Sequence, residues 1–209
     1  MLITSRAFVE ISVIIILLLT AGLPAVIFMK YQKNHGLHLL YWGLGLLVFV
    51  ISVFLELLMA AGIFSRFLID LYLFLVAILV DFLAMGSFAL FGNKKYLNYY
   101  YLYTGLASIF LLITLIIYPV GKIIIHHIVF GPLPLMVVVS SSFVSFPAAF
   151  FIILIAALSY KKSRNIKLLS IIAGVIVVSI AGTLYIAAIP VFLYYAEFIG
   201  ILLLWIGFK

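Results

Sequence analysis

Seven long apolar segments occupy almost the whole chain, and short polar breaks separate them. At about 1.5 Å per residue, helices of this length are long enough to cross the apolar core of a bilayer, which is about 30 Å thick. The sequence therefore predicts an all-α, polytopic membrane protein in which residues 1–209 form a single transmembrane domain. The predicted helices cover about residues 8–29, 38–62, 67–91, 97–118, 133–160, 168–188 and 191–208.

The composition excludes a soluble protein, because 69% of the residues are hydrophobic and only 8% are charged. Soluble domains carry about 25% charged residues. The net charge of +7 does not indicate a nucleic-acid partner, since the basic residues lie between the apolar segments, where membrane topology explains them. We expect membrane lipids, and other membrane subunits in one alternative, as partners. The absence of cysteine excludes disulfides and thiolate metal sites.

The distribution of basic residues predicts the orientation. If seven helices thread the membrane in turn, nine of the 12 Lys and Arg residues lie on one side. Cytoplasmic loops are enriched in Lys and Arg, so the N-terminus is predicted outside and the C-terminus in the cytoplasm of a multi-pass cell-membrane protein. The predicted cytoplasmic residues are Lys30, Lys33, Lys94, Lys95, Lys161, Lys162, Arg164, Lys167 and Lys209, against Arg6, Arg66 and Lys122 outside.

Acidic residues inside the apolar segments are the sharpest chemical signal. Asp70 and Asp81 lie eleven residues apart in the third segment, about three helical turns, so they share a face. The predicted threading places Glu56 and Glu197 in the outer half of the membrane together with Asp70, and Asp81 near the middle. Ionisable groups at such depth are candidates for function. We therefore predict an outward-facing acidic cavity lined by these four residues.

Structural roles for the same acids are the alternative. Arg66 precedes Asp70 by four residues, which permits an ion pair along one helix. Glu56 and Asp81 have no basic residue four positions away in sequence. For these two acids, a structural hydrogen bond and a functional role are equally good interpretations.

Two further segments have open interpretations. The serines before Pro147 in the fifth segment either line a substrate path or satisfy carbonyls that a proline kink leaves free. The tyrosines that open the fourth segment are typical of an interfacial aromatic belt. These residues are Ser140, Ser141, Ser142 and Ser145, and Tyr96, Tyr99, Tyr100, Tyr101 and Tyr103.

The stretch from Lys122 to Pro132 is too short to span a membrane and is expected to be a loop or an interfacial helix. Its His126 and His127 are adjacent, so in a helix they point about 100° apart and do not readily share a metal. No metal site is predicted, and nothing in the sequence identifies a cofactor.

Short motifs along most of the chain carry a resemblance: His38-Leu-Leu-Tyr-Trp42 before Glu56, Gly86 in an aromatic-rich helix, Ile180-Ala-Gly-Thr183, and Tyr194-Tyr-Ala-Glu197-Phe-Ile-Gly200 before Gly207-Phe208. They resemble a group of prokaryotic seven-helix integral membrane proteins for which no activity is established. The resemblance implies the seven-helix topology and carries no function.

The first three and last three segments also align weakly. A parallel 3+1+3 repeat and chance matching between apolar segments explain this alignment equally well. This plan is similar to that of sugar-exporting seven-helix transporters and, more loosely, of rhodopsin-like proteins, an analogy of architecture alone. The aligned pairs are Tyr31 with Tyr160, Lys33 with Lys162, Gly45 with Gly174 and, after a two-residue slip, Asp70 with Glu197.

These observations favour a non-enzymatic membrane protein whose acidic cavity binds or moves a proton, a cation or a small solute. One alternative is an accessory subunit of a larger membrane complex, such as a respiratory one. The other is a membrane enzyme acting on lipids through His126, His127 and the outer acids.

Overall fold

The computed structural model describes residues 6–63, 65–121, 124–125, 128–129, 133–186 and 191–208, with backbone alone for 6–9, 124–125, 128–129, 178–186, 191–194 and 208. Within these ranges it contains all seven predicted helices, whose ends lie within five residues of the prediction. The elements are α1 (Arg6–Asn34), α2 (Leu37–Ala60), α3 (Arg66–Phe91), α4 (Lys94–Ile117), β1 (Ile124–Ile125), β2 (Ile128–Val129), α5 (Leu135–Ser163), α6 (Ile166–Ile186) and α7 (Val191–Phe208).

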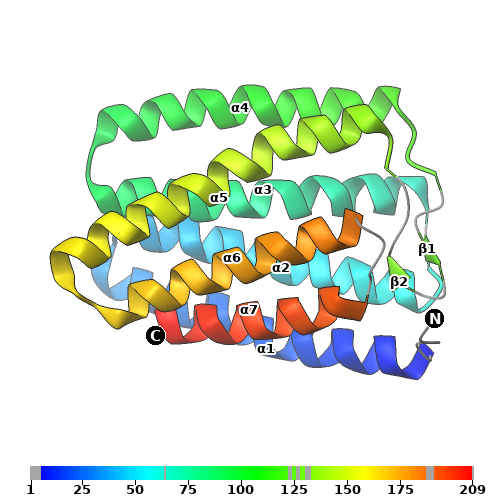
Figure 1. Ribbon diagram of the computed structural model, residues 1–209, viewed down its shortest axis with the longest axis horizontal. Helices are drawn as coiled ribbons and strands as arrows, with labels where there is room; N and C mark the ends of the chain where they lie inside the picture. The colour runs from blue at the N-terminus through cyan, green and yellow to red at the C-terminus, as the bar shows by residue number, and fades with distance from the viewer. Residues whose placement is uncertain are drawn as a thin grey trace.

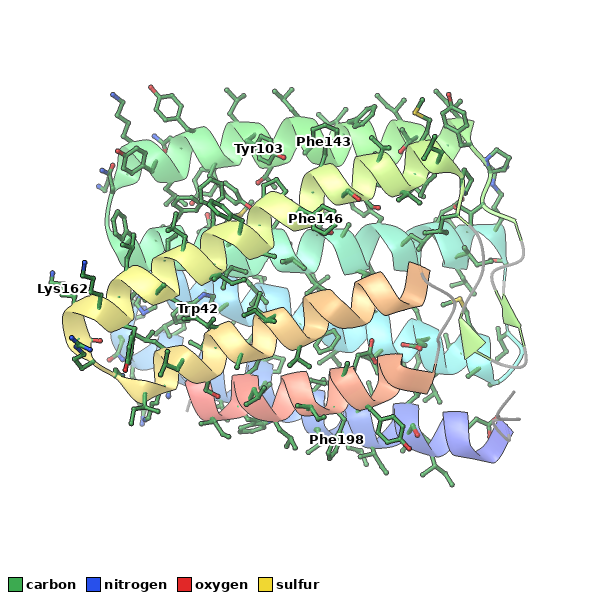
Figure 2. All side chains as sticks on the ribbon, in the orientation of Figure 1. Trp42, Tyr103, Phe143, Phe146, Lys162 and Phe198 are labelled. Atoms are coloured by element: carbon green, nitrogen blue, oxygen red, sulfur yellow. The ribbon has the colours of Figure 1, made fainter. Side chains whose placement is uncertain are left out.

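Consecutive helices run in opposite directions, so the two termini lie at opposite ends of one bundle (Figure 1). The end that holds the C-terminus also holds the α1–α2, α3–α4 and α5–α6 turns and with them most of the basic residues, including Lys162 (Figure 2). We call it the basic end. The opposite end carries β1 and β2, which pair antiparallel.

Five helices, α1 to α5, are long and apolar enough to cross a membrane, which is consistent with a multi-pass membrane protein. In α6 and α7 the described side chains cover shorter apolar stretches, Ile166–Val177 and Tyr195–Gly207, and spans there stay predictions. Large apolar side chains on the outer face of α4, such as Leu102 and Ile116, are 65% and 73% exposed, as lipid contact requires.

Local polar residues set the helix boundaries. The Ser65 hydroxyl accepts a hydrogen bond from the Leu68 amide at the start of α3. Gly92 ends α3 in the left-handed conformation (φ 82°), which glycine adopts without a steric penalty. The Asn93 side chain then accepts from the Lys95 and Tyr96 amides and begins α4 three residues earlier than the apolar pattern predicted.

Glycines allow close packing of neighbouring helices. A Cβ on Gly45 in α2 would lie 3.1 Å from the Leu79 carbonyl oxygen of α3. A Cβ on Gly174 in α6 would lie 3.2 Å from the Gly200 carbonyl oxygen of α7. Small residues at such contacts are typical of helix pairs in membranes, because they let the backbones approach.

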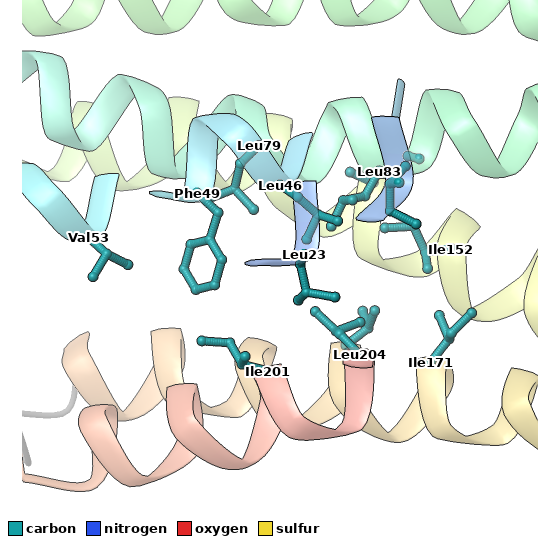
Figure 3. Packing of buried hydrophobic residues seen from close by; sticks show 14 of the residues in the cluster. Leu23, Leu46, Phe49, Val53, Leu79, Leu83, Ile152, Ile171, Ile201 and Leu204 are labelled. Carbon is teal, nitrogen blue, oxygen red and sulfur yellow. The ribbon is translucent and has the colours of Figure 1, made fainter. Parts of the chain in front are cut away.

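Buried apolar side chains form two clusters. The larger joins α1, α2, α3, α5, α6 and α7 and continues to the first turns of α4 (Figure 3). Leu23 of α1, Leu46 of α2 and Leu204 of α7 meet near its centre. The second lies between α2, α3, α4 and α5, nearer the end opposite the basic end.

The structure corrects one expectation in α5. Pro147 has no N–H to donate to the Phe143 carbonyl one turn earlier. That carbonyl accepts a hydrogen bond from the Tyr103 hydroxyl of α4 (Figure 2), whereas Ser140 and Ser141 bond to the carbonyls of residues 137 and 138. The serines therefore do not replace the missing donor. For the stretch between α4 and α5 the sequence left a loop or an interfacial helix open, and there the described residues 124–125 and 128–129 form two short paired strands.

Candidate functional site

A cavity of about 270 Å³ lies inside the bundle. Its walls come from α2, α3 and α5, with contributions from α4, α6 and α7. Most of the lining is apolar, and the polar part consists of Ser52, Glu56, Tyr72, Ser141, Ser142, Ser145 and Glu197. A largely apolar cavity with a few convergent polar groups is the usual form of a small-molecule site.

Two of the four predicted site residues, Glu56 and Glu197, line this cavity together. Their exposed fractions are 1% and 9%. The two side chains are close enough to interact electrostatically, although they lie on α2 and α7. One carboxyl oxygen of Glu197, Oε2, is buried and has no hydrogen-bond partner in the described part of the chain. The site thus holds two acids in an apolar setting, where ionisation of both is costly without a counter-charge.

Asp81 lies in a separate cluster between α3, α4 and α5 and does not line the cavity. It is 1% exposed, and its Oδ1 accepts a hydrogen bond of 2.6 Å from the Tyr100 hydroxyl. Around this pair, the rings of Phe88, Tyr100 and Phe151 pack with centroids 4.7 to 5.8 Å apart. Sequence reasoning assigned Tyr100 to an interfacial belt, but only 4% of it is exposed and it belongs to this cluster.

Asp70 also lies outside the cavity lining. The Arg66 Nε lies 3.5 Å from its carboxylate, which confirms the predicted pair four residues apart. The same guanidinium donates to the Ile116 carbonyl near the end of α4. This contact ties the start of α3 to the end of α4. The predicted cavity of four acids is therefore corrected to a pair, Glu56 and Glu197, with Asp70 and Asp81 elsewhere.

Among the described residues, no three His, Asp or Glu side chains gather closely enough to hold a metal ion. His126 and His127 lie outside the described residues. No protein-family model, curated protein or solved structure shows a significant match to the chain.

Proposed function

We propose that this protein is a non-enzymatic membrane protein whose cavity binds or moves a cation, a proton or a small cationic solute through Glu56 and Glu197. The observation that carries the proposal is the Glu197 side chain, which lines the cavity and whose buried Oε2 has no hydrogen-bond partner in the described part of the chain. A positive charge placed between the two carboxylates would offset both their desolvation and their mutual repulsion. Intramembrane acids that face a cavity commonly serve this purpose.

The proposal includes the orientation predicted from the basic residues. The basic end would face the cytoplasm and the end with β1 and β2 the exterior. Glu56 lies four residues before the end of α2 and Glu197 six residues after the start of α7, so both acids are nearer the proposed outer surface. The cavity would then receive its ligand on that side.

Substituting either acid tests the site. In nanodiscs, calorimetric titration with Na⁺, K⁺, guanidinium and tetramethylammonium should detect binding of at least one cation to the wild type. Glu197→Gln and Glu56→Gln keep the side-chain shape and remove the charge, so each should weaken that binding about 10-fold or more. Asp81→Asn is the matched control, because Asp81 is equally buried but outside the cavity lining, and it should bind as the wild type does.

Two outcomes would contradict the proposal. One is wild-type affinity in both glutamate variants. The other is the absence of binding of every cation in the series to the wild type.

The orientation is tested by cysteine labelling, for which the chain offers a clean background because it contains no cysteine. Lys162→Cys lies at the basic end and Ala61→Cys at the opposite end, both exposed. In intact cells, a membrane-impermeant maleimide should label the second and leave the first unlabelled until the cells are opened. Labelling of Lys162→Cys alone would reverse the proposed orientation.

A further inference from the structure

The cavity reaches the side of the bundle. Two of its lining residues, Phe146 on α5 and Val76 on α3, are 61% and 38% exposed, although most of the lining is buried or half-buried. In a membrane protein the side of the bundle faces lipid, so the cavity opens towards the acyl chains.

The cavity is also polarised along its length. Its two acids lie within about 9 Å of their helix ends, at 1.5 Å per residue. Its other pole is apolar, and there Leu83 and Ile152 each lie 17 residues into their helices, about 25 Å deep. Both α3 and α5 begin at the end of the bundle near which the acids lie. The depth of Leu83 and Ile152 therefore separates the acidic pole of the cavity from its apolar pole.

A bare metal ion does not match this lining. It would have to shed its hydration shell for two carboxylates, hydroxyls and a long apolar wall. An amphiphile matches both poles, since its apolar body contacts the deep wall and its positive group meets the acids. Its orientation would also match that of lipids in the outer leaflet.

We propose that the ligand is a lipophilic organic cation, such as an alkylammonium, that enters from the bilayer past Phe146 of α5 and places its charged group at Glu56 and Glu197. This inference rests on the proposed function and adds to it the class of ligand and the route.

A pair of ions with one head group tests the ligand class. Hexyltrimethylammonium differs from tetramethylammonium by five methylenes, and each methylene that becomes buried strengthens binding about fourfold. In nanodiscs, with empty nanodiscs subtracted, hexyltrimethylammonium should bind at least about 30-fold more tightly than tetramethylammonium. Glu197→Gln should weaken its binding about 10-fold or more, while Asp81→Asn should leave it unchanged.

The outcomes separate this inference from the proposed function. If both ions bind equally and both depend on Glu197, the cation site stands and the lipophilic ligand is overturned. If neither ion nor any cation of the earlier series binds, or if binding is indifferent to Glu197, both proposals fail.

Access from the bilayer is tested with two phenylalanines one turn apart on α5. Phe146 and Phe150 are 61% and 60% exposed, but only Phe146 is among the residues lining the cavity. Phe146→Cys and Phe150→Cys each introduce one cysteine, which pyrenyl maleimide then enlarges. The label at 146 should slow association of hexyltrimethylammonium about 10-fold or more, and the label at 150 should leave the rate within about twofold of the unlabelled protein. Equal rates for the two labelled proteins would overturn the lateral route.

Discussion

Gly86→Ala will destabilise the protein by about 2–4 kcal/mol, because a side chain at this position overpacks the α2–α3 interface and breaks a hydrogen bond. A Cβ on Gly86 would lie 2.3 Å from the Trp42 ring and 3.0 Å from the His38 carbonyl oxygen. The Trp42 indole cannot move away freely, since its Nε1 donates to the Leu83 carbonyl at 3.2 Å. The free energy of unfolding, measured in mixed micelles with increasing denaturing detergent, reports the loss.

Gly105→Ala is the matched control. Gly105 also lies inside a helix, α4, but a Cβ there would meet no atom within 4 Å. Alanine forms helices better than glycine, so this variant should be as stable as the wild type or more stable by up to about 1 kcal/mol. Equal stability of the two variants would show that α2 and α3 do not pack as closely at Gly86 as the structure places them.

The helices were predictable because membrane-spanning helices depend on one property, the length of an apolar run, which sequence shows directly. Their ends were less predictable, since polar residues such as Asn34 and Lys94 continue the helices past the apolar runs. The strands between α4 and α5 are only two residues long each, and no periodic signal exists at that length.

The candidate site was predictable in part, from local spacing and from the depth that the threading gives each acid. The Arg66–Asp70 pair follows from a spacing of four residues on one helix. Glu56 and Glu197 lie 141 residues apart in sequence, and the threading predicted them in one cavity, where the structure places both. The threading did not show that Asp70 and Asp81 lie outside that cavity. Which acids meet depends on how each helix is rotated and packed.

Tyr100 illustrates the same limit. It stands among five tyrosines within eight residues, and α4 is apolar on several faces, so sequence does not show which ring turns inward. In the structure three of them contact other helices: Tyr100 bonds to Asp81, the Tyr101 hydroxyl donates to that of Tyr41, and the Tyr103 hydroxyl donates to the Phe143 carbonyl. The 3+1+3 repeat, the resemblance to the prokaryotic seven-helix group and the two alternative functions stay predictions.

Tyr103→Phe will lower the free energy of unfolding by about 1–2 kcal/mol, because it removes the donor that replaces the N–H missing at Pro147. The phenyl ring keeps its packing, so the loss isolates the hydroxyl. Inside a membrane no water can donate to a carbonyl that has lost its donor, so the loss of this hydrogen bond costs more than it would at an aqueous surface. The exposed Tyr99 on the same helix supplies the control, and Tyr99→Phe should change stability by less than about 0.5 kcal/mol.

A double-mutant cycle with Pro147→Ala identifies the cause. Alanine at 147 restores an N–H that can donate to the Phe143 carbonyl within α5. In that background the Tyr103 hydroxyl is no longer needed, so Tyr103→Phe should lose most of its effect, with a coupling energy of about 1 kcal/mol. If Tyr103→Phe is equally destabilising with proline or alanine at 147, the hydroxyl stabilises the α4–α5 pair in some other way. The cycle thus shows whether a proline inside a membrane helix is tolerated here because its neighbour supplies the missing donor.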